Sequence, residues 1–183
     1  MAKAILILLL LGVGLKLFAQ EEDVPAITNQ QLTANVAQTS PVPVTEEGSF
    51  FNLIVPRFVQ TMHQNQSSLL APRVINNDNA TGVRTTRYFT VTGVEVLVEA
   101  GAHSGRIQQV TINSAELTNN NDIRQWLFAA ANALRAFDSN LSLSEAYLLI
   151  VQAQQDGSIN DGTMNISFSF INQSVYRLVV TAI

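Results

Sequence analysis

Hydrophobic and polar residues alternate most regularly at the C-terminal end of the chain. In the segments MNISFSF (164–170) and VYRLVVTAI (175–183), apolar residues recur at every second position. This period is typical of strands that have one buried face, and the polar break at Asn172–Ser174 is typical of a turn. We therefore predict a terminal β-hairpin. Its facing apolar side chains are expected to be Ile166, Phe168 and Phe170 on one strand and Tyr176, Leu178 and Val180 on the other.

A second alternating segment, RYFTVTGVEVLVEAG (87–101), changes phase in its middle. Its apolar residues share one parity up to Gly93 and the other parity from Val94 onward. A phase change at a glycine is typical of a β-bulge. Because GRIQQVTI (105–112) resumes the strand pattern after a glycine-rich stretch, we predict a β-hairpin over residues 87–112.

The segment NNNDIRQWLFAAANALRAF (119–137) has the period of an amphipathic helix. Asn120 or Asn121 is expected to cap its start. Its polar residues fall opposite an apolar stripe, which excludes a membrane span and predicts that the stripe lies on a core. The stripe consists of Ile123, Trp126, Leu127, Ala130, Leu134 and Phe137.

A second helix is predicted over SLSEAYLLIVQAQQDG (142–157). Ser142 and Glu145 have the spacing of a capping box, and Gly157 supplies a stop signal. The apolar residues of this segment span a wide arc, which predicts that the helix is covered on more than one side.

Two segments before these elements have weaker patterns. SFFNLIVPRFVQTMH (49–63) has helical spacing, but Pro56 in its middle disfavours a helix interior. A helix is the preferred interpretation, and a strand at residues 50–55 followed by a helical turn is the alternative. NQSSLLAPRVINNDNATGVRTT (65–86) contains Pro72 and Gly82 and is predicted to be a loop.

Together these elements predict an α+β domain. We expect an antiparallel sheet of about four strands, formed by two hairpins, with two helices packed on one face. The expected order is (α)-β-β-α-α-β-β, and the domain is expected to occupy residues 48–183.

The N-terminal residues have a different composition. An apolar run of 12 residues, Ala4–Leu15, follows Lys3; it is shorter than the roughly 20 residues that span a bilayer and fits the core of a signal peptide. We predict a signal peptide over residues 1–19; an uncleaved signal anchor is the alternative, because Leu17 is large for its position before the cleavage site. Residues 20–47, which are polar and lack aromatic side chains, are predicted to form a flexible leader or linker.

Charge and cysteine content exclude several classes of protein. Without residues 1–19, the chain has eight arginines, no lysine and fourteen acidic residues, so its formal net charge is 8 − 14 = −6. An acidic chain with scattered arginines is a poor nucleic-acid binder, and no nucleic-acid partner is expected. The absence of cysteine excludes disulfides, thiol catalysis and thiolate metal sites.

Few residues could support catalysis. Glu95 and Glu99 share one strand face, but four residues of strand place them about 13 Å apart, beyond the roughly 5–9.5 Å that glycoside hydrolysis requires. His103, in the predicted hairpin loop, and Glu99 supply at most two ligands of a zinc site. We therefore predict no catalytic residue, no metal site and no cofactor.

Five Asn-x-Ser/Thr sequons occur in the chain, at Asn65, Asn79, Asn140, Asn165 and Asn172. Asn65 and Asn79, in the predicted loop, are the preferred candidate glycosylation sites if the source is eukaryotic. In a bacterial protein the sequons would carry no meaning.

The helix at residues 119–137 also carries a candidate partner-binding patch. Phe128 falls away from the apolar stripe, between Arg124 and Arg135. Aromatic residues and arginine are enriched at binding hot spots, so these three residues are the candidate patch. The alternative is that the segment 49–62 packs over Phe128.

The function expected from the sequence is that of a secreted, non-enzymatic binding or extracellular structural module with an unidentified protein partner. The alternative is a carrier of a small apolar ligand, held between the sheet and the second helix. A secreted hydrolase that uses His103, Glu95 and Glu99 is the least favoured interpretation.

Overall fold

The computed structural model describes residues 45–117, 119–172 and 174–183. The predicted signal peptide (1–19) lies outside the described residues, as does all but the last part of the predicted leader (20–47). The described residues belong to one compact unit of the chain.

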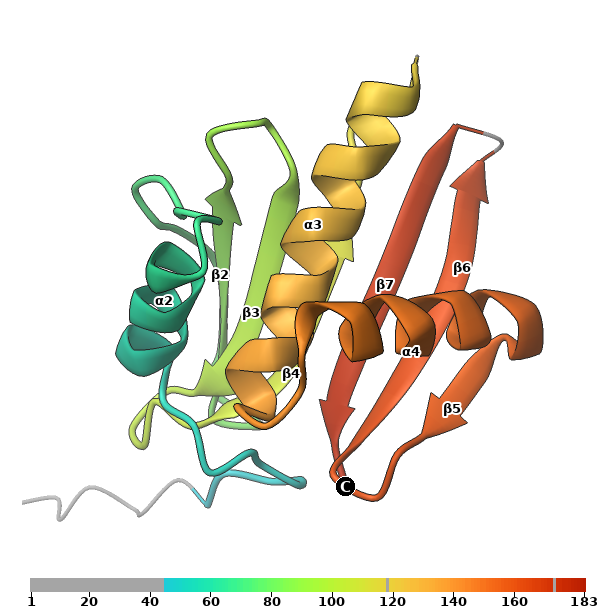
Figure 1. Ribbon diagram of the computed structural model, residues 1–183. Helices are drawn as coiled ribbons and strands as arrows, with labels where there is room; N and C mark the ends of the chain where they lie inside the picture. Colours follow the sequence, from blue (N-terminus) through green and yellow to red (C-terminus); the bar gives the residue numbers. More distant parts are fainter. Residues whose placement is uncertain (1–44, 118, 173) are drawn as a thin grey trace, which may run out of the picture. The chain divides into compact units, whose positions relative to one another are not determined.

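Three helices and seven strands occur in the described residues (Figure 1). In chain order they are α2 (Val55–Gln64), β1 (Arg73–Asp78), β2 (Val83–Phe89), β3 (Glu95–Gly101), β4 (Ile107–Asn113), α3 (Asn120–Phe137), α4 (Leu143–Asp156), β5 (Ser158–Asn160), β6 (Met164–Asn172) and β7 (Val175–Ala182).

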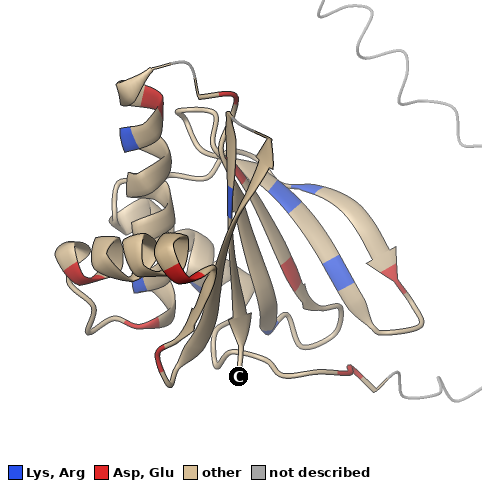
Figure 2. Cartoon of the chain, turned by 90° about the vertical axis from the view of Figure 1, so that its right-hand side faces the viewer, with Lys and Arg blue, Asp and Glu red and all other residues tan. Residues whose placement is uncertain are grey.

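All seven strands of the described residues form one antiparallel sheet in the order β1-β2-β3-β4-β7-β6-β5. The three helices lie on one face of it, as Figures 1 and 2 show from two directions. The predicted α+β class and antiparallel sheet are confirmed. The prediction of about four strands was wrong, because the sheet is larger.

The sheet is larger partly because the predicted loop at residues 65–86 contains β1 and the start of β2. Every residue of β1 except Asp78 is exposed, so β1 has no buried parity that could produce an alternating pattern. Gly82, with φ of 67°, lies in the turn that leads from β1 to β2. An edge strand without a buried face is therefore indistinguishable from a loop in hydropathy alone.

The predicted β-bulge at Gly93 was also wrong. The chain reverses there, and Gly93, with φ of 84°, lies in the turn between β2 and β3. Thr90 Oγ1 accepts a hydrogen bond from the Val94 N–H at 3.0 Å and closes this turn. A turn and a bulge both shift the alternation of side chains by one residue, so the sequence pattern alone did not separate them.

The ambiguous segment at residues 49–63 is helical only from Val55, where α2 begins, so the preferred helix is confirmed for this part alone. The residues before it are extended, as the alternative predicted: the Phe51 N–H donates to the Ile107 carbonyl, and Ile54 forms a bridge with Arg106. Pro56 lies in the first turn, where its missing N–H costs no helical hydrogen bond. The proline therefore marks the start of the helix, and Phe58 and Met62 are its buried residues.

The terminal hairpin is confirmed with its register. Ile166 pairs with Val180, Phe168 with Leu178 and Phe170 with Tyr176. The short strand β5 pairs with β6 at the edge and was not predicted, since three residues are too few to establish a period.

Helix α3 crosses the centre of the sheet between α2 and α4 (Figure 1). Trp126 is 1% exposed, and its indole N–H donates to the Ile112 carbonyl at 3.4 Å. The N-cap lies one or two residues before the predicted caps: Asn119 takes this position and forms a capping box with Asp122. The buried stretch Ala129–Leu134 extends around the helix beyond the predicted stripe, because α3 has neighbours on both flanks.

Helix α4 begins at the predicted Ser142–Glu145 capping box and ends at Gly157. Its buried residues, Ala146, Ile150 and Ala153, lie on one face. Leu148 is 68% exposed and Val151 43% exposed, so the prediction that this helix is covered on more than one side was wrong.

Replacing Ser142 by alanine should lower the free energy of unfolding by about 1 kcal/mol. Ser142 Oγ accepts the Glu145 N–H at 3.2 Å, and a Glu145 carboxylate oxygen accepts the Ser142 N–H at 2.8 Å. Chemical denaturation would measure the loss. Ser144→Ala, an exposed change in the same turn, is the control; equal losses in both variants would contradict the capping role.

Candidate functional site

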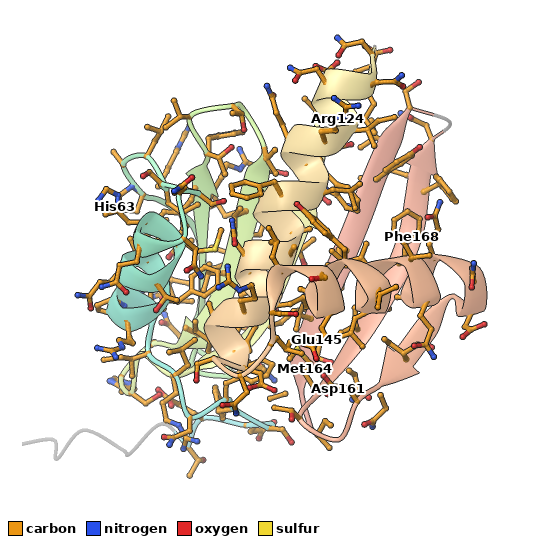
Figure 3. All side chains as sticks on the ribbon, in the orientation of Figure 1. His63, Arg124, Glu145, Asp161, Met164 and Phe168 are labelled. Atoms are coloured by element: carbon orange, nitrogen blue, oxygen red, sulfur yellow. The ribbon has the colours of Figure 1, made fainter. Side chains whose placement is uncertain are left out.

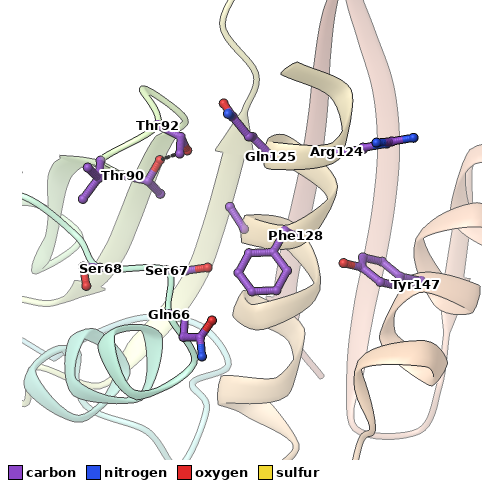
Figure 4. A pocket seen from close by; sticks show the side chains of 11 residues that line it. Gln66, Ser67, Ser68, Thr90, Thr92, Arg124, Gln125, Phe128 and Tyr147 are labelled. Carbon is purple, nitrogen blue, oxygen red and sulfur yellow. Dashed lines mark hydrogen bonds between the residues drawn. The ribbon is translucent and has the colours of Figure 1, made fainter. Parts of the chain in front are cut away.

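A cavity of about 440 Å³ opens beside Phe128 on the helical side of the molecule (Figure 4). We call it the Phe128 hollow. Its walls come from residues 66–68 after α2, a segment that we call the strap, and from the β2–β3 turn, the N-terminal half of α3 and one residue of α4. The lining residues are Gln66, Ser67, Ser68, Thr90, Val91, Thr92, Arg124, Gln125, Phe128, Ala129 and Tyr147.

The strap at residues 66–68 is held in place by backbone geometry. Gln66 adopts φ of 63°, which is uncommon for a residue other than glycine. This conformation lets the chain double back at the end of α2, where the Ser67 N–H donates to the Met62 carbonyl at 2.8 Å. The strap then runs beside the β2–β3 turn, because the Leu70 N–H donates to the Phe89 carbonyl.

A fully buried amide joins the strap to α3. The side-chain nitrogen of Asn132 donates to the Asn65 carbonyl and to Ser67 Oγ, each at 2.8 Å. The Asn132 side-chain oxygen accepts from Arg135 at 3.2 Å. The sequence pattern placed Asn132 on the polar face of the helix, whereas this residue is 0% exposed and fixes one wall of the hollow.

Replacing Asn132 by alanine should destabilise the fold by about 1–3 kcal/mol, because the Asn65 carbonyl and Ser67 hydroxyl would lose a buried hydrogen-bond donor. Thermal or chemical denaturation would measure the loss. Asn121→Ala, an exposed change in the same helix, is the control and should have a much smaller effect. An Asn132→Ala protein as stable as this control would contradict the structural role of the amide.

Two of the three predicted patch residues line the hollow together. Phe128 is half-buried in its wall, and Arg124, one helical turn earlier, is exposed at its rim. Arg135 lies outside the lining, and its guanidinium donates to Asn132 and to the Leu141 carbonyl. The segment 49–62 stacks two phenylalanines, Phe51 and Phe58, on Phe137 at the far end of α3.

The remaining wall residues carry no recognisable sequence signal. Tyr147 belongs to α4, and its hydroxyl points toward Phe128 (Figure 4). Burial raises the pKa of the Tyr147 phenol further above neutral pH, and its hydroxyl can donate a hydrogen bond. The Thr90 and Thr92 hydroxyls share a hydrogen bond of 2.9 Å at the opposite wall. Only the fold brings these three segments around Phe128.

The three candidate hydrolase residues are not assembled into one site. Glu95, at the start of β3, forms a 2.8 Å ion pair with Arg87 and accepts a hydrogen bond from Asn113. Glu99 lies four residues along the same strand, and burial raises its pKa. His103 lies beyond the far end of β3, in the turn to β4.

The backbone of the His103 turn is held by a carboxylate from the segment before α2. Glu46 accepts the N–H groups of His103 and Ser104 at 2.8 and 2.9 Å. The side-chain and backbone hydrogen bonds from Ser104 lower the pKa of the Glu46 carboxyl. The folded region therefore includes contacts from a residue within the predicted leader.

Glu46 should contribute stability that is present at neutral pH and lost under acid conditions. Because its pKa is lower in the folded protein, protonation favours unfolding as the pH falls below about 4.5 and through the folded pKa. Melting temperatures measured between neutral and acid pH should therefore fall less in Glu46→Gln than in the unmodified protein. Identical pH profiles would contradict this contribution. Glu99, with its raised pKa, acts in the opposite direction and is common to both proteins.

His63 lies at the end of α2 and points away from α3 (Figure 3). One ring nitrogen, Nδ1, lies 2.7 Å from Ser68 Oγ, and the histidine is exposed. Among the described residues, no acidic side chain hydrogen-bonds this imidazole, so the pair lacks the third member that orients a catalytic base. Within the same residues, no cluster of three or more histidine or acidic side chains is placed to hold a metal ion.

The two candidate glycosylation sites differ in exposure. Asn79 is exposed in the turn after β1, whereas Asn65 is half-buried at the end of α2 and the serine of its sequon, Ser67, is buried. Asn79 is therefore the more accessible of the two candidate glycosylation sites.

None of the helices in the described part of the chain is sufficiently long and apolar to cross a bilayer.

Comparison of the chain with protein-family models, curated proteins and solved structures gives no match. The functional argument therefore depends on the geometry of the chain itself.

Proposed function

We propose that the protein is an exported binding module, and that the Phe128 hollow binds a ligand with a compact apolar group and an acidic group. The observation that carries this proposal is the composition of the lining. Arg124 is its one charged residue, and it contains no acidic residue, although the chain as a whole is acidic.

The apolar part of the ligand would contact the ring of Phe128 and its neighbours. Phe128, Ala129 and Tyr147 supply an apolar floor and one wall, and Val91 on the opposite rim is 72% exposed. Pockets of roughly 300–1,000 Å³ are typical of small-ligand sites, and this cavity lies within that range at about 440 Å³. Covering the apolar surface of Phe128 and Val91 would provide the main driving force for binding.

The acidic part of the ligand would contact Arg124. Within the described residues the Arg124 side chain forms no hydrogen bond or ion pair, so its guanidinium is free to bind a carboxylate through two parallel hydrogen bonds. Hydroxyl and amide groups of the lining, from Thr92 and Gln125, can then orient the ligand.

Export and a non-enzymatic role complete the proposal. Export is supported by the apolar run and polar flank of residues 1–19. A non-enzymatic role is supported by the separation of Glu95 and His103 and by the incomplete His63–Ser68 pair.

A carrier that retains a small apolar ligand is the second candidate, and the Phe128 hollow is its site. The cavity expected between α4 and the sheet is not favoured, since Ala146, Ile150 and Ala153 pack there at 0–1% exposure. Native mass spectrometry of protein purified from its source distinguishes the candidates: a carrier would keep an added mass beyond the polypeptide and any glycans.

A fluorescent probe with the same chemistry tests the site directly. The naphthalene rings and sulfonate of 8-anilinonaphthalene-1-sulfonate combine apolar surface with an anion. We expect this dye to bind the folded protein with enhanced fluorescence, to lose binding in Phe128→Ser and to bind more weakly in Arg124→Gln. Because Phe128 is half-buried, Phe128→Ser should cost only about 1 kcal/mol of stability and leave the fold intact.

Two matched variants control for nonspecific effects. Leu148→Ser removes an exposed apolar side chain from another helix, and Arg57→Gln removes an exposed arginine from α2. Both should bind the dye like the unmodified protein. Absence of binding, or equal binding by the Phe128 and Leu148 variants, would refute the proposal. Competition by 3-phenylpropionate, compared with a short peptide that ends in Asp-Phe, would show whether a free acid or a polypeptide fits better.

A further inference from the structure

The two edges of the sheet differ in how they are protected. Strand β5 forms one edge and has only three residues. Strand β1 forms the other edge and has six residues, of which Val74 is 54% and Ile75 41% exposed. An edge strand has backbone N–H and C=O groups that point away from the sheet and are available to another strand.

The charges of β1 lie at its two ends. The strand reads RVINND, with Arg73 first and Asp78 last, and Figure 2 shows one basic and one acidic end on this edge strand. Within the described residues, Arg73 forms no hydrogen bond or ion pair, and it lies directly opposite another arginine, Arg87. Because Arg87 already pairs with Glu95, Arg73 has a like charge beside it and no acidic partner.

A bulge at Ile75 places Arg73 and Asp78 on the same face of the sheet. Arg73 pairs with Arg87 and Asp78 with Val83, and the register shifts between Val74 and Asn76. Arg87 and Val83 are four residues apart on β2, so they share a face, and their partners on β1 share it too. Without the bulge, residues 73 and 78 would point to opposite faces.

We propose that β1 pairs with β1 of a second copy of this chain, in antiparallel orientation about a two-fold axis, to form one continuous sheet. Arg73 of each copy then lies opposite Asp78 of the other, on one face, and Val74 lies opposite Asn77. Two identical ion pairs form because the interface is symmetric. This inference is independent of the Phe128 hollow.

Asp78 is prepared for this contact. Its carboxylate accepts the Ala80 N–H and the Thr81 hydroxyl, each at 2.9 Å, and these hydrogen bonds lower its pKa. The carboxylate is thus charged at neutral pH and fixed at the end of the strand, with lone pairs left to accept from a guanidinium.

Sedimentation of the full chain over a wide concentration range tests the proposal. We expect a reversible monomer–dimer equilibrium. Arg73→Asp would place like charges opposite each other at both ends of the paired strands and should weaken the dimer at least about tenfold. The control Arg57→Asp makes the same charge change on exposed α2 and should leave the equilibrium unchanged.

A mixing experiment tests the register itself. Arg73→Asp and Asp78→Arg should each dimerise poorly alone, but an equimolar mixture should form a heterodimer, since each end then has opposite charges. If Asp78→Arg does not fold because its turn is lost, the comparison of Arg73→Asp with Arg57→Asp remains decisive. A chain that stays monomeric at all concentrations, or an Arg73→Asp dimer as stable as the control, would overturn the proposal. Protection from hydrogen exchange, in a monomer, of those β1 amides that do not bond to β2 would also overturn it and assign the edge to another occupant.

Discussion

The burial of α3 on three sides is the constraint on which the rest of the fold depends. The sheet lies beneath this helix, and α2 and α4 lie on its flanks. Helices approach closely only where side chains are small, and Ala129, Ala130, Ala131 and Ala133 are all at most 2% exposed. The large residues occur at the two ends of this stretch: Trp126 contacts Phe168 and Tyr176 over the sheet, and Phe137 stacks on Phe51 and Phe58. The buried amide of Asn132 supplies a polar contact between α3 and the end of α2.

The position of the Phe128 hollow follows from the unequal lengths of the helices. Contacts between Phe58 and Phe137, and between Asn65 and Asn132, show that α2 runs beside the C-terminal half of α3. On the N-terminal side of Asn132, α3 continues but α2 has already ended. The strap at residues 66–68 and the β2–β3 turn form the wall there. These thinner segments do not fill the space beside Phe128. A cavity therefore remains where a helix of 10 residues lies beside one of 18.

The face of the sheet opposite the helices is held by polar contacts. An ion pair and two hydrogen bonds link Arg87, Glu95, Asn113 and Arg177 across four neighbouring strands. Asn113 is 6% exposed, although no helix of the described residues covers this face, and its amide donates to Glu95 and accepts from Arg177. Glu95, which belonged to the least favoured hydrolase interpretation of the sequence, is thus a member of this structural network.

The sequence by itself determined the elements whose pattern is local. The register of the terminal hairpin, the extent of α3 and the capping box of α4 follow from spacings of two to four residues, which side-chain geometry fixes within one element. It also identified Phe128 and Arg124 as neighbours, since they are one helical turn apart. Tertiary structure alone decided the rest. Exposed β1 has no pattern to read, Asn132 is buried only because α2 ends beside it, and Ser67, Thr90 and Tyr147 meet around Phe128 only because three distant segments pack on one helix. Contacts between residues far apart in the chain leave no periodic signal, and so the site became visible only in the folded protein.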